Sequence, residues 1–109
     1  EKHGNIYIEY QEKSDIHKNK YVNSGILKND NCKFFLIGTE KQFYIFRKST
    51  LIQILKEEIQ HHRQNLPSPR HIQFKQKATS KGFVFPVKYA LKETISLEEM
   101  IAEIKKSLL

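Results

Sequence analysis

The order of segments in the sequence predicts an α/β (α+β) domain in which a mixed central β-sheet is flanked by helices. Several short segments alternate or concentrate apolar residues between turn residues, which is typical of strands. Two longer segments repeat apolar residues at helical spacing, each behind a sequence that caps a helix. The expected order is therefore strand, loop, strand, strand, helix, strand, strand and helix.

The first expected strand runs from Gly4 to Lys13 and alternates with a period of two. One face carries three side chains that a sheet would bury: Ile6, Ile8 and Tyr10. The other face carries four side chains of different character: Tyr7, Glu9, Gln11 and Lys13. A polar loop over 14–23 follows, and it ends in the tight turn Ser24-Gly25-Ile26, where Gly25 frees the backbone.

A hairpin and a helix are expected next. The apolar run 33–37 predicts a buried strand, and 42–47 predicts its antiparallel partner across a turn at 39–41. The helix is expected over 49–65, because Thr50 and Gln53 have the spacing of a capping box, and two prolines end it: Pro67 and Pro69.

The last third of the chain predicts two short strands and a second helix. Residues 71–75 form the first of these strands and 83–85 the second, which Pro86 stops and therefore places at a sheet edge. Ser96 and Glu99 form another capping box, which opens a helix to about residue 109.

Length and composition predict one domain over residues 1–109. The chain is 39% hydrophobic and 28% charged, as is ordinary for a globular domain. No apolar run approaches the roughly 18 residues that span a bilayer, and the N-terminus lacks a signal-peptide pattern. The single cysteine, Cys32, adjoins an apolar strand and is expected to be buried, so the sequence predicts a cytoplasmic protein without disulfides.

The net charge of +7 predicts a polyanionic partner, most simply nucleic acid bound through its phosphates. Lysine supplies nearly all of this charge, since the arginines are Arg47, Arg63 and Arg70. A lysine-rich composition alone gives the same charge, so a basic surface without a nucleic-acid partner stays the alternative.

The polar face of the first strand has the composition of a metal-dependent nuclease site. A carboxylate such as Glu9 can hold a divalent metal, and a group two residues on, such as Gln11, can position the attacking water. Tyr7 lies on the same expected face, where an exposed ring can stack on a base. The alternative is a half-exposed strand that performs no chemistry.

Three segments carry a resemblance to a known family: Gly4-Asn5-Ile6-Tyr7-Ile8-Glu9-Tyr10, Ser24-Gly25-Ile26 and Cys32-Lys33-Phe34-Phe35-Leu36-Ile37. With the helix at 49–65 and the strand Gly82-Phe83-Val84-Phe85-Pro86, they resemble small phage-type members of the PD-(D/E)xK (restriction-endonuclease-like) nuclease superfamily. The resemblance covers about residues 4–90 and implies a restriction-endonuclease-like core that hydrolyses DNA phosphodiester bonds with a metal ion.

The resemblance also implies roles for individual residues. Glu9 would bind Mg²⁺ or Mn²⁺, Gln11 would orient the attacking water, and Lys13 would stabilise developing negative charge. Three lysines in the following loops would contact phosphates: Lys18, Lys20 and Lys28.

The sequence departs from the family pattern at two positions. The family carries an acidic residue on a preceding strand, whereas Glu1 is the sole carboxylate upstream of Gly4. Gln11 occupies the family's lysine position, and Lys13 on the same expected face could substitute for it. We therefore expect either a domain that lacks the family's N-terminal helix and strand, or a relative that binds nucleic acid or protein without cleavage.

Several other residues are expected to have structural roles. His61 and His62 are adjacent on a helix and point about 100° apart, which does not suit one shared metal ion. Asp15 and Asp30 lie in turn-like sequence, where Asp caps the backbone. The amphipathic C-terminal helix leaves room for a homodimer.

Overall fold

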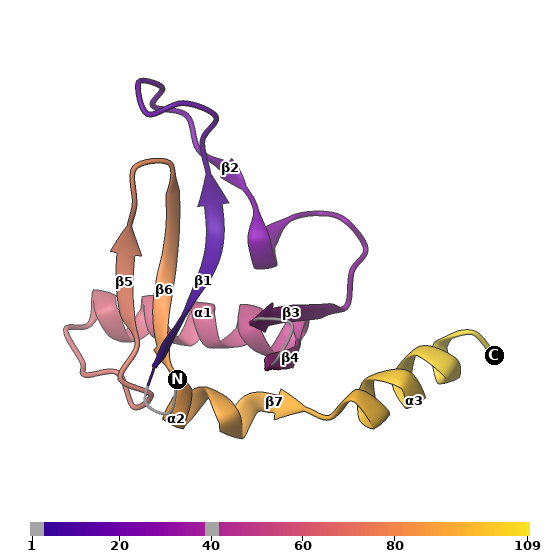
Figure 1. The fold of residues 1–109 in the computed structure, drawn as a ribbon. Helices are drawn as coiled ribbons and strands as arrows, with labels where there is room; N and C mark the ends of the chain where they lie inside the picture. Colours follow the sequence, from indigo (N-terminus) through magenta and orange to yellow (C-terminus); the bar gives the residue numbers. More distant parts are fainter. Residues whose placement is uncertain (1–3, 39–41) are drawn as a thin grey trace.

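A computed structural model describes residues 4–38 and 42–109 of the chain (Figure 1). These residues form an α+β structure with two separate antiparallel sheets. Glu1 and the turn expected at 39–41 lie outside the described residues.

The larger sheet has the strand order β2-β1-β6-β5. Its strands are β1 (Asn5–Glu12), β2 (Val22–Asn23), β5 (Gln73–Gln76) and β6 (Ser80–Pro86). The apolar face predicted for the first strand is confirmed, since Ile6 and Ile8 are buried. The edge position predicted for residues 83–85 is wrong, because β6 pairs with β1 on one side and with β5 on the other. Pro86 is tolerated because it is the last residue of the strand.

The smaller sheet has the order β3-β4-β7. It contains β3 (Phe34–Gly38), β4 (Phe43–Arg47) and β7 (Thr94–Ile95). The predicted antiparallel pairing of the second and third strands is confirmed, with Leu36 opposite Ile45. A single mixed sheet was predicted, and this part of the prediction is wrong. β1 pairs with β2 and β6, whereas among the described residues β3 pairs only with β4, so the strands expected in one sheet are divided between two.

Helix α1 (Lys48–Arg63) follows β4 directly and confirms the expected helix. Leu51, Ile54 and Leu55 form its buried stripe. The capping box predicted for Thr50 and Gln53 does not form, because the helix already begins at Lys48 and places Thr50 inside its first turn. The Gln53 side chain instead donates to Glu57 Oε2 at 3.2 Å.

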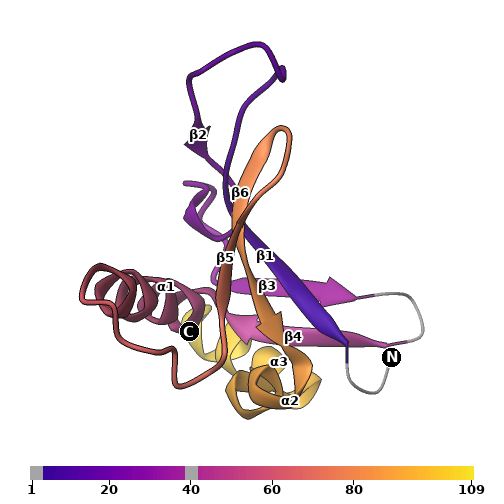
Figure 2. The same cartoon turned by 90° about the vertical axis from the view of Figure 1, so that its left-hand side faces the viewer.

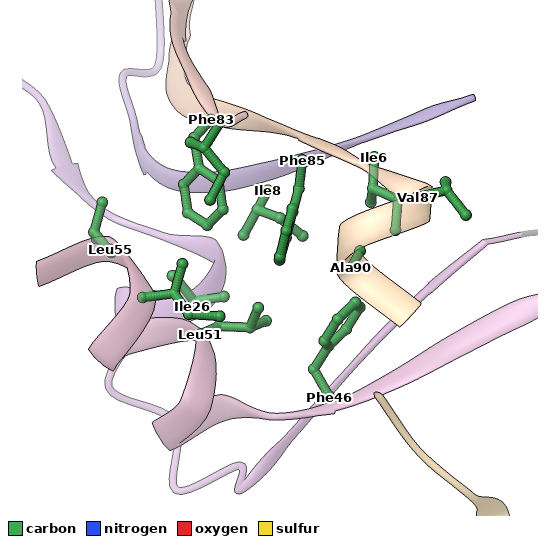
Figure 3. Close-up of a cluster of buried hydrophobic side chains, with 12 residues drawn as sticks. Ile6, Ile8, Ile26, Phe46, Leu51, Leu55, Phe83, Phe85, Val87 and Ala90 are labelled. Atoms are coloured by element: carbon green, nitrogen blue, oxygen red, sulfur yellow. The ribbon is translucent and has the colours of Figure 1, made fainter. Parts of the chain in front are cut away.

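The core lies where the two sheets and α1 meet (Figure 3). Short helical segments complete it: η1 (Gly25–Leu27), α2 (Val87–Ala90) and η2 (Leu91–Glu93). Ile8, Ile26, Phe46 and Phe83 are fully enclosed, so residues from four separate segments share one core. This shared core orients the ends of β1 and β6 that extend beyond it.

The C-terminal helix α3 (Leu97–Ser107) begins with the predicted capping box. Ser96 Oγ accepts from the Glu99 backbone N–H, and Glu99 Oε1 accepts from the Ser96 N–H, which confirms the prediction. None of the α3 residues, all of which are described, is buried. No helix within residues 4–38 and 42–109 has the length and apolarity needed to cross a membrane.

Cys32 is exposed, so the prediction of a buried cysteine is wrong. The chain is still in a loop at this residue, and β3 begins two residues later at Phe34. The Cys32 N–H donates to Asp30 Oδ1 at 3.0 Å, which confirms Asp30 as a turn residue. Asp15 Oδ1 likewise accepts from the His17 N–H at 2.9 Å.

Candidate nucleic-acid interface

A β-bulge in β1 divides the face that the sequence predicted to be continuous. Glu9 pairs with Gly82 and Gln11 pairs with Lys81, so Tyr10 has no partner of its own on β6. An extra residue shifts the alternation of the strand by one position. Residues opposite each other in a sheet share a face, so Glu9 lies on the face of Gly82 and Gln11 on the face of Lys81. Gly82 and Lys81 are adjacent on β6, so they lie on opposite faces of the sheet.

The bulge therefore places Glu9 and Gln11, both predicted site residues, on opposite faces of the sheet. Tyr7 and Glu9 share one face of the sheet, opposite Val84 and Gly82. Gln11 instead lies on the same face as Phe83, which is the core face. Along the strand, however, Gln11 lies beyond the end of the core. The sequence showed an unbroken period of two and contained no signal for the extra residue.

Tyr7 is held in place by contacts with β6 and its hairpin. Its hydroxyl lies 2.9 Å from Ser80 Oγ in a hydrogen bond. Lys77 Nζ lies 3.9 Å from the centre of the Tyr7 ring. The ring passes over Gly82, where an added Cβ would lie 2.6 Å from Tyr7 Cζ. A glycine opposite Glu9 is thus what allows the tyrosine to lie flat along the sheet.

Glu9 is oriented by the predicted Ser-Gly-Ile turn. Ser24 Oγ donates to Glu9 Oε2 at 2.7 Å, and the Ser24 side chain is itself buried. Gly25 has φ of +51°, and a Cβ there would lie 2.0 Å from the Glu9 carbonyl oxygen. The turn predicted at Gly25 is confirmed, and this close approach explains why glycine occupies it.

Tyr21 is the centre of a second cluster of polar and basic side chains, on the other face of the sheet. Lys81 Nζ lies 4.3 Å and Lys13 Nζ 5.2 Å from the centre of its ring. Gln76 Nε2 donates to the Tyr21 hydroxyl at 3.1 Å. Gln11 Nε2 donates to Asn23 Oδ1 at a long 3.4 Å. Lys13 and Lys81 therefore both contact the Tyr21 ring, while Glu9 faces the Ser24 turn.

The sequence interpretation missed several of these residues: Tyr21, Gln76, Lys77 and Lys81. Lys77 and Lys81 flank the turn before the Gly-aromatic strand, which was a weak signal for a basic hairpin tip. The contact between this tip and the loop after β1 joins segments at least 55 residues apart, so no local pattern could reveal it.

Two basic segments extend together beyond the core (Figure 2). They are the β1–β2 loop, 13–21, and the tip of the β5–β6 hairpin, 76–81, and the Lys13 N–H joins them by donating to the Thr79 carbonyl at 2.8 Å. We call these two segments the basic projection. It contains five lysines and one acidic residue, Asp15: Lys13, Lys18, Lys20, Lys77 and Lys81.

The remaining predicted lysine lies elsewhere. Lys28 is exposed after η1, and its carbonyl oxygen accepts from Lys48 Nζ at 2.7 Å. Lys18 and Lys20 lie within the basic projection, but Lys28 does not belong to it.

Tyr10 lies where the basic projection joins the core. Its ring meets Phe74 edge-on with centroids 6.5 Å apart. Burial, and to a smaller extent the neighbouring Tyr7, raises the pKa of Tyr10. The Tyr10 ring packs against the core, whereas the Tyr7 and Tyr21 rings contact lysines.

The described residues do not assemble a divalent-metal site around Glu9. No group of three His, Cys, Asp or Glu side chains comes together among residues 4–38 and 42–109. Mg²⁺ requires about six oxygen ligands, usually with one or two carboxylates besides water or substrate. Glu9 belongs to no such group, so no catalytic step through a metal follows from the described residues.

His61 and His62 have separate surroundings. His61 Nδ1 lies 2.7 Å from the Glu57 carbonyl oxygen of the preceding helical turn. The His62 ring meets Phe74 edge-on at 5.6 Å.

Comparisons of the chain with protein-family models, with curated proteins and with solved structures find no match. The functional assignment therefore depends on the site itself and on the sequence motifs.

Proposed function

We propose that the chain binds nucleic acid, and specifically DNA, through the basic projection. The observation that carries this proposal is the clustering of five lysines on two adjacent tips, three of them beside tyrosine rings. Phosphates are bound by such cations with release of counterions, which makes the affinity strongly dependent on salt.

The tyrosine rings also hold the lysine side chains of this surface in position. A lysine over an aromatic face keeps its ammonium hydrogens available to a phosphate while its stem is held in place. Less side-chain entropy is then lost on binding. Gln76, Gln11 and Asn23 add polar groups that can hydrogen-bond to sugar or phosphate oxygens.

The proposal is tested with fluorescently labelled duplex and single-stranded DNA in anisotropy titrations over a series of salt concentrations. The variant Lys13→Gln/Lys77→Gln/Lys81→Gln removes three cations from the projection. We expect at least a tenfold loss of affinity at low salt and a salt dependence smaller by about two to three in logarithmic slope.

A matched control removes three cations elsewhere: Lys56→Gln/Lys88→Gln/Lys92→Gln. Lys88 and Lys92 also lie near an aromatic ring, that of Tyr89, each at 5.7 Å. Equal losses of affinity in the two triple variants would mean that net charge alone attracts DNA, and would contradict a defined interface.

The second candidate is metal-dependent cleavage of DNA on a restriction-endonuclease-like core. The observation that favours it is the Glu9 carboxylate, which Ser24 orients at the base of the projection, within the sequence block that resembles the nuclease superfamily. Under this proposal Glu9 is a ligand of Mg²⁺ or Mn²⁺, and a further carboxylate must approach it. Gln11 and Lys13 would then act on DNA from the neighbouring face.

Cleavage is tested by nicking of supercoiled plasmid with Mg²⁺, Mn²⁺ or EDTA, comparing the protein with Glu9→Ala. Metal-dependent nicking that disappears in Glu9→Ala supports cleavage. A preparation that binds plasmid but nicks none of it under any of these conditions would leave binding as the function.

A further inference from the structure

Helix α3 carries an apolar stripe that the rest of the chain does not cover. Its residues are spaced by four, three and four positions: Leu97, Ile101, Ile104 and Leu108. Each is at least 41% exposed, and Leu108 is 79% exposed. The spacing is that of the a and d positions of a two-helix seam.

The helix is attached to the body by its polar face. Arg47 Nη2 lies 2.6 Å from Glu103 Oε2 and 3.8 Å from Glu99 Oε2. At 100° per residue, the apolar stripe is centred about 150° around the helix from these two carboxylates. The ion pairs therefore leave the stripe exposed, with its members Leu97 and Ile104 also bordering hollows shared with the body, and Figure 1 shows α3 extending outward from the sheets.

The stripe belongs to a larger concentration of apolar surface. Of the eleven exposed large hydrophobic side chains among the described residues, eight lie in α3, its C-terminal end, η2 and the β3–β4 hairpin. They are Leu36, Phe43, Leu91, Leu97, Ile101, Ile104, Leu108 and Leu109. Phe43, Leu91 and Leu97 border the same hollow, so the stripe continues onto the smaller sheet. A monomer gains nothing by exposing so much apolar surface in one region.

We propose that α3 pairs antiparallel with α3 of a second copy of this chain, across a two-fold axis. In the register that stacks the stripes, Leu97 meets Leu108 of the partner subunit and Ile101 meets Ile104 of the partner subunit. Two residues flank the stripe on the same side, Glu98 and Lys105, one helical heptad apart.

The charges of these flanking residues select the antiparallel orientation. Antiparallel pairing brings Glu98 next to Lys105 of the partner subunit, and two-fold symmetry produces this contact twice. Parallel pairing would instead set Lys105 beside the uncharged Met100 of the partner subunit, because e positions then face g positions, and the Glu98–Lys105 contacts would be absent. The partner proposed here is therefore a second copy rather than an unrelated apolar segment.

The first experiment is sedimentation equilibrium over a concentration series, with a thiol reductant present because Cys32 is exposed. We expect a reversible monomer–dimer equilibrium. Ile101→Glu/Ile104→Glu should raise the dissociation constant at least a hundredfold, while Ala102→Glu, which adds charge away from the stripe, should raise it less than about threefold. Circular dichroism checks that both variants are folded. A wild-type monomer at all concentrations, or a dimer that survives Ile101→Glu/Ile104→Glu, overturns the proposal.

The second experiment tests the antiparallel register. Glu98→Lys and Lys105→Glu should each raise the dissociation constant roughly tenfold at low salt, because each creates two like-charge contacts. The combined variant Glu98→Lys/Lys105→Glu restores both pairs and should return the constant to within about twofold of wild type. If the losses of dimerisation free energy in the two single variants simply add up in the combined variant, the antiparallel pairing is wrong. These measurements involve no DNA and stand apart from the proposed binding function.

Discussion

The strands β1 and β6 run side by side, and the bulge near Gln11 divides the pair into two halves with opposite properties. In the inner half, Ile8 and Phe83 face each other and are fully buried. In the outer half, Gln11 faces Lys81, and the neighbouring contacts are those of lysines with Tyr21. The same antiparallel ladder thus serves as the centre of the core at one end and as an exposed basic surface at the other.

The difference teaches that stability and binding are physically separable in this chain. The inner half contributes apolar burial, which stabilises at about 25 cal/mol per Å². The outer half contributes exposed cation–aromatic contacts, each of which stabilises by about 0.5–1 kcal/mol. Substitutions in the inner half should therefore unfold the protein, whereas those in the outer half should alter binding.

The largest expected effect comes from the inner half. Phe83→Ala should lower the free energy of unfolding by about 3–5 kcal/mol, because a fully buried ring is replaced by a cavity. Phe43→Ala is the matched control, since Phe43 is 48% exposed, and it should cost about 1 kcal/mol or less. Urea unfolding followed by circular dichroism measures both. Similar costs for the two variants would contradict the placement of the core between the sheets.

The second effect concerns the boundary between the halves. In Gly82→Ala, the new Cβ would lie 2.4 Å from the Ile8 carbonyl oxygen and 2.6 Å from Tyr7 Cζ. We expect a loss of about 2–3 kcal/mol in the free energy of unfolding, as for other overpacked sites. Adding Tyr7→Ala should relieve only part of this loss, because the backbone oxygen of Ile8 remains. Full recovery in the double variant would show that the tyrosine ring alone requires the glycine.

The sequence predicted the local elements of the fold well. The alternation of Ile6 and Ile8, the turn at Gly25 and the capping box at Ser96 all follow from rules that act within a few residues. The helix at α1 and the β3–β4 hairpin were found for the same reason.

The errors arose where distant segments meet. The bulge at Tyr10 depends on how β6 pairs with β1, and so it moves Gln11 to another face than the alternation indicated. Two sheets replaced one because β1 pairs with β6, which is almost 70 residues beyond it in the chain, while β3 pairs with β4. The lysine–tyrosine contacts of the projection are of the same kind, since Tyr21 and Lys81 meet only through the tertiary fold.

The third effect sharpens the separation of the two halves. The variant Lys13→Gln/Lys77→Gln/Lys81→Gln, which should bind DNA at least tenfold more weakly, is expected to lose no more than about 3 kcal/mol in the free energy of unfolding. Its circular dichroism spectrum should match that of the wild type. A loss as large as that of Phe83→Ala would mean that the projection is part of the folding core, and weakened DNA binding could not then be attributed to the interface.

The smallest effect concerns a third region, the loop between η1 and β3, which an ion pair holds to the body. Buried Lys48 donates from Nζ to Asp30 Oδ1 at 2.8 Å. This hydrogen bond, with that from the Cys32 N–H, lowers the pKa of Asp30 from its ordinary 3.8 to about 2. A lowered folded-state pKa means that the charged carboxylate stabilises the fold above its ordinary pKa and that this contribution disappears as the pH falls to the folded-state value.

Asp30→Asn should therefore lower the melting temperature near pH 7, and the difference from wild type should shrink as the pH falls from about 4 towards 2. Asp15→Asn is the control, because Asp15 also accepts a backbone hydrogen bond but lies in the projection without a lysine bond that holds its loop to the core. It should change the melting temperature less. Thermal unfolding at a series of pH values measures both variants. If the Asp30→Asn difference were the same at pH 3 as at pH 7, the lysine–aspartate contact would not be what fixes this loop, and the loop would be held by its neighbours in the chain alone.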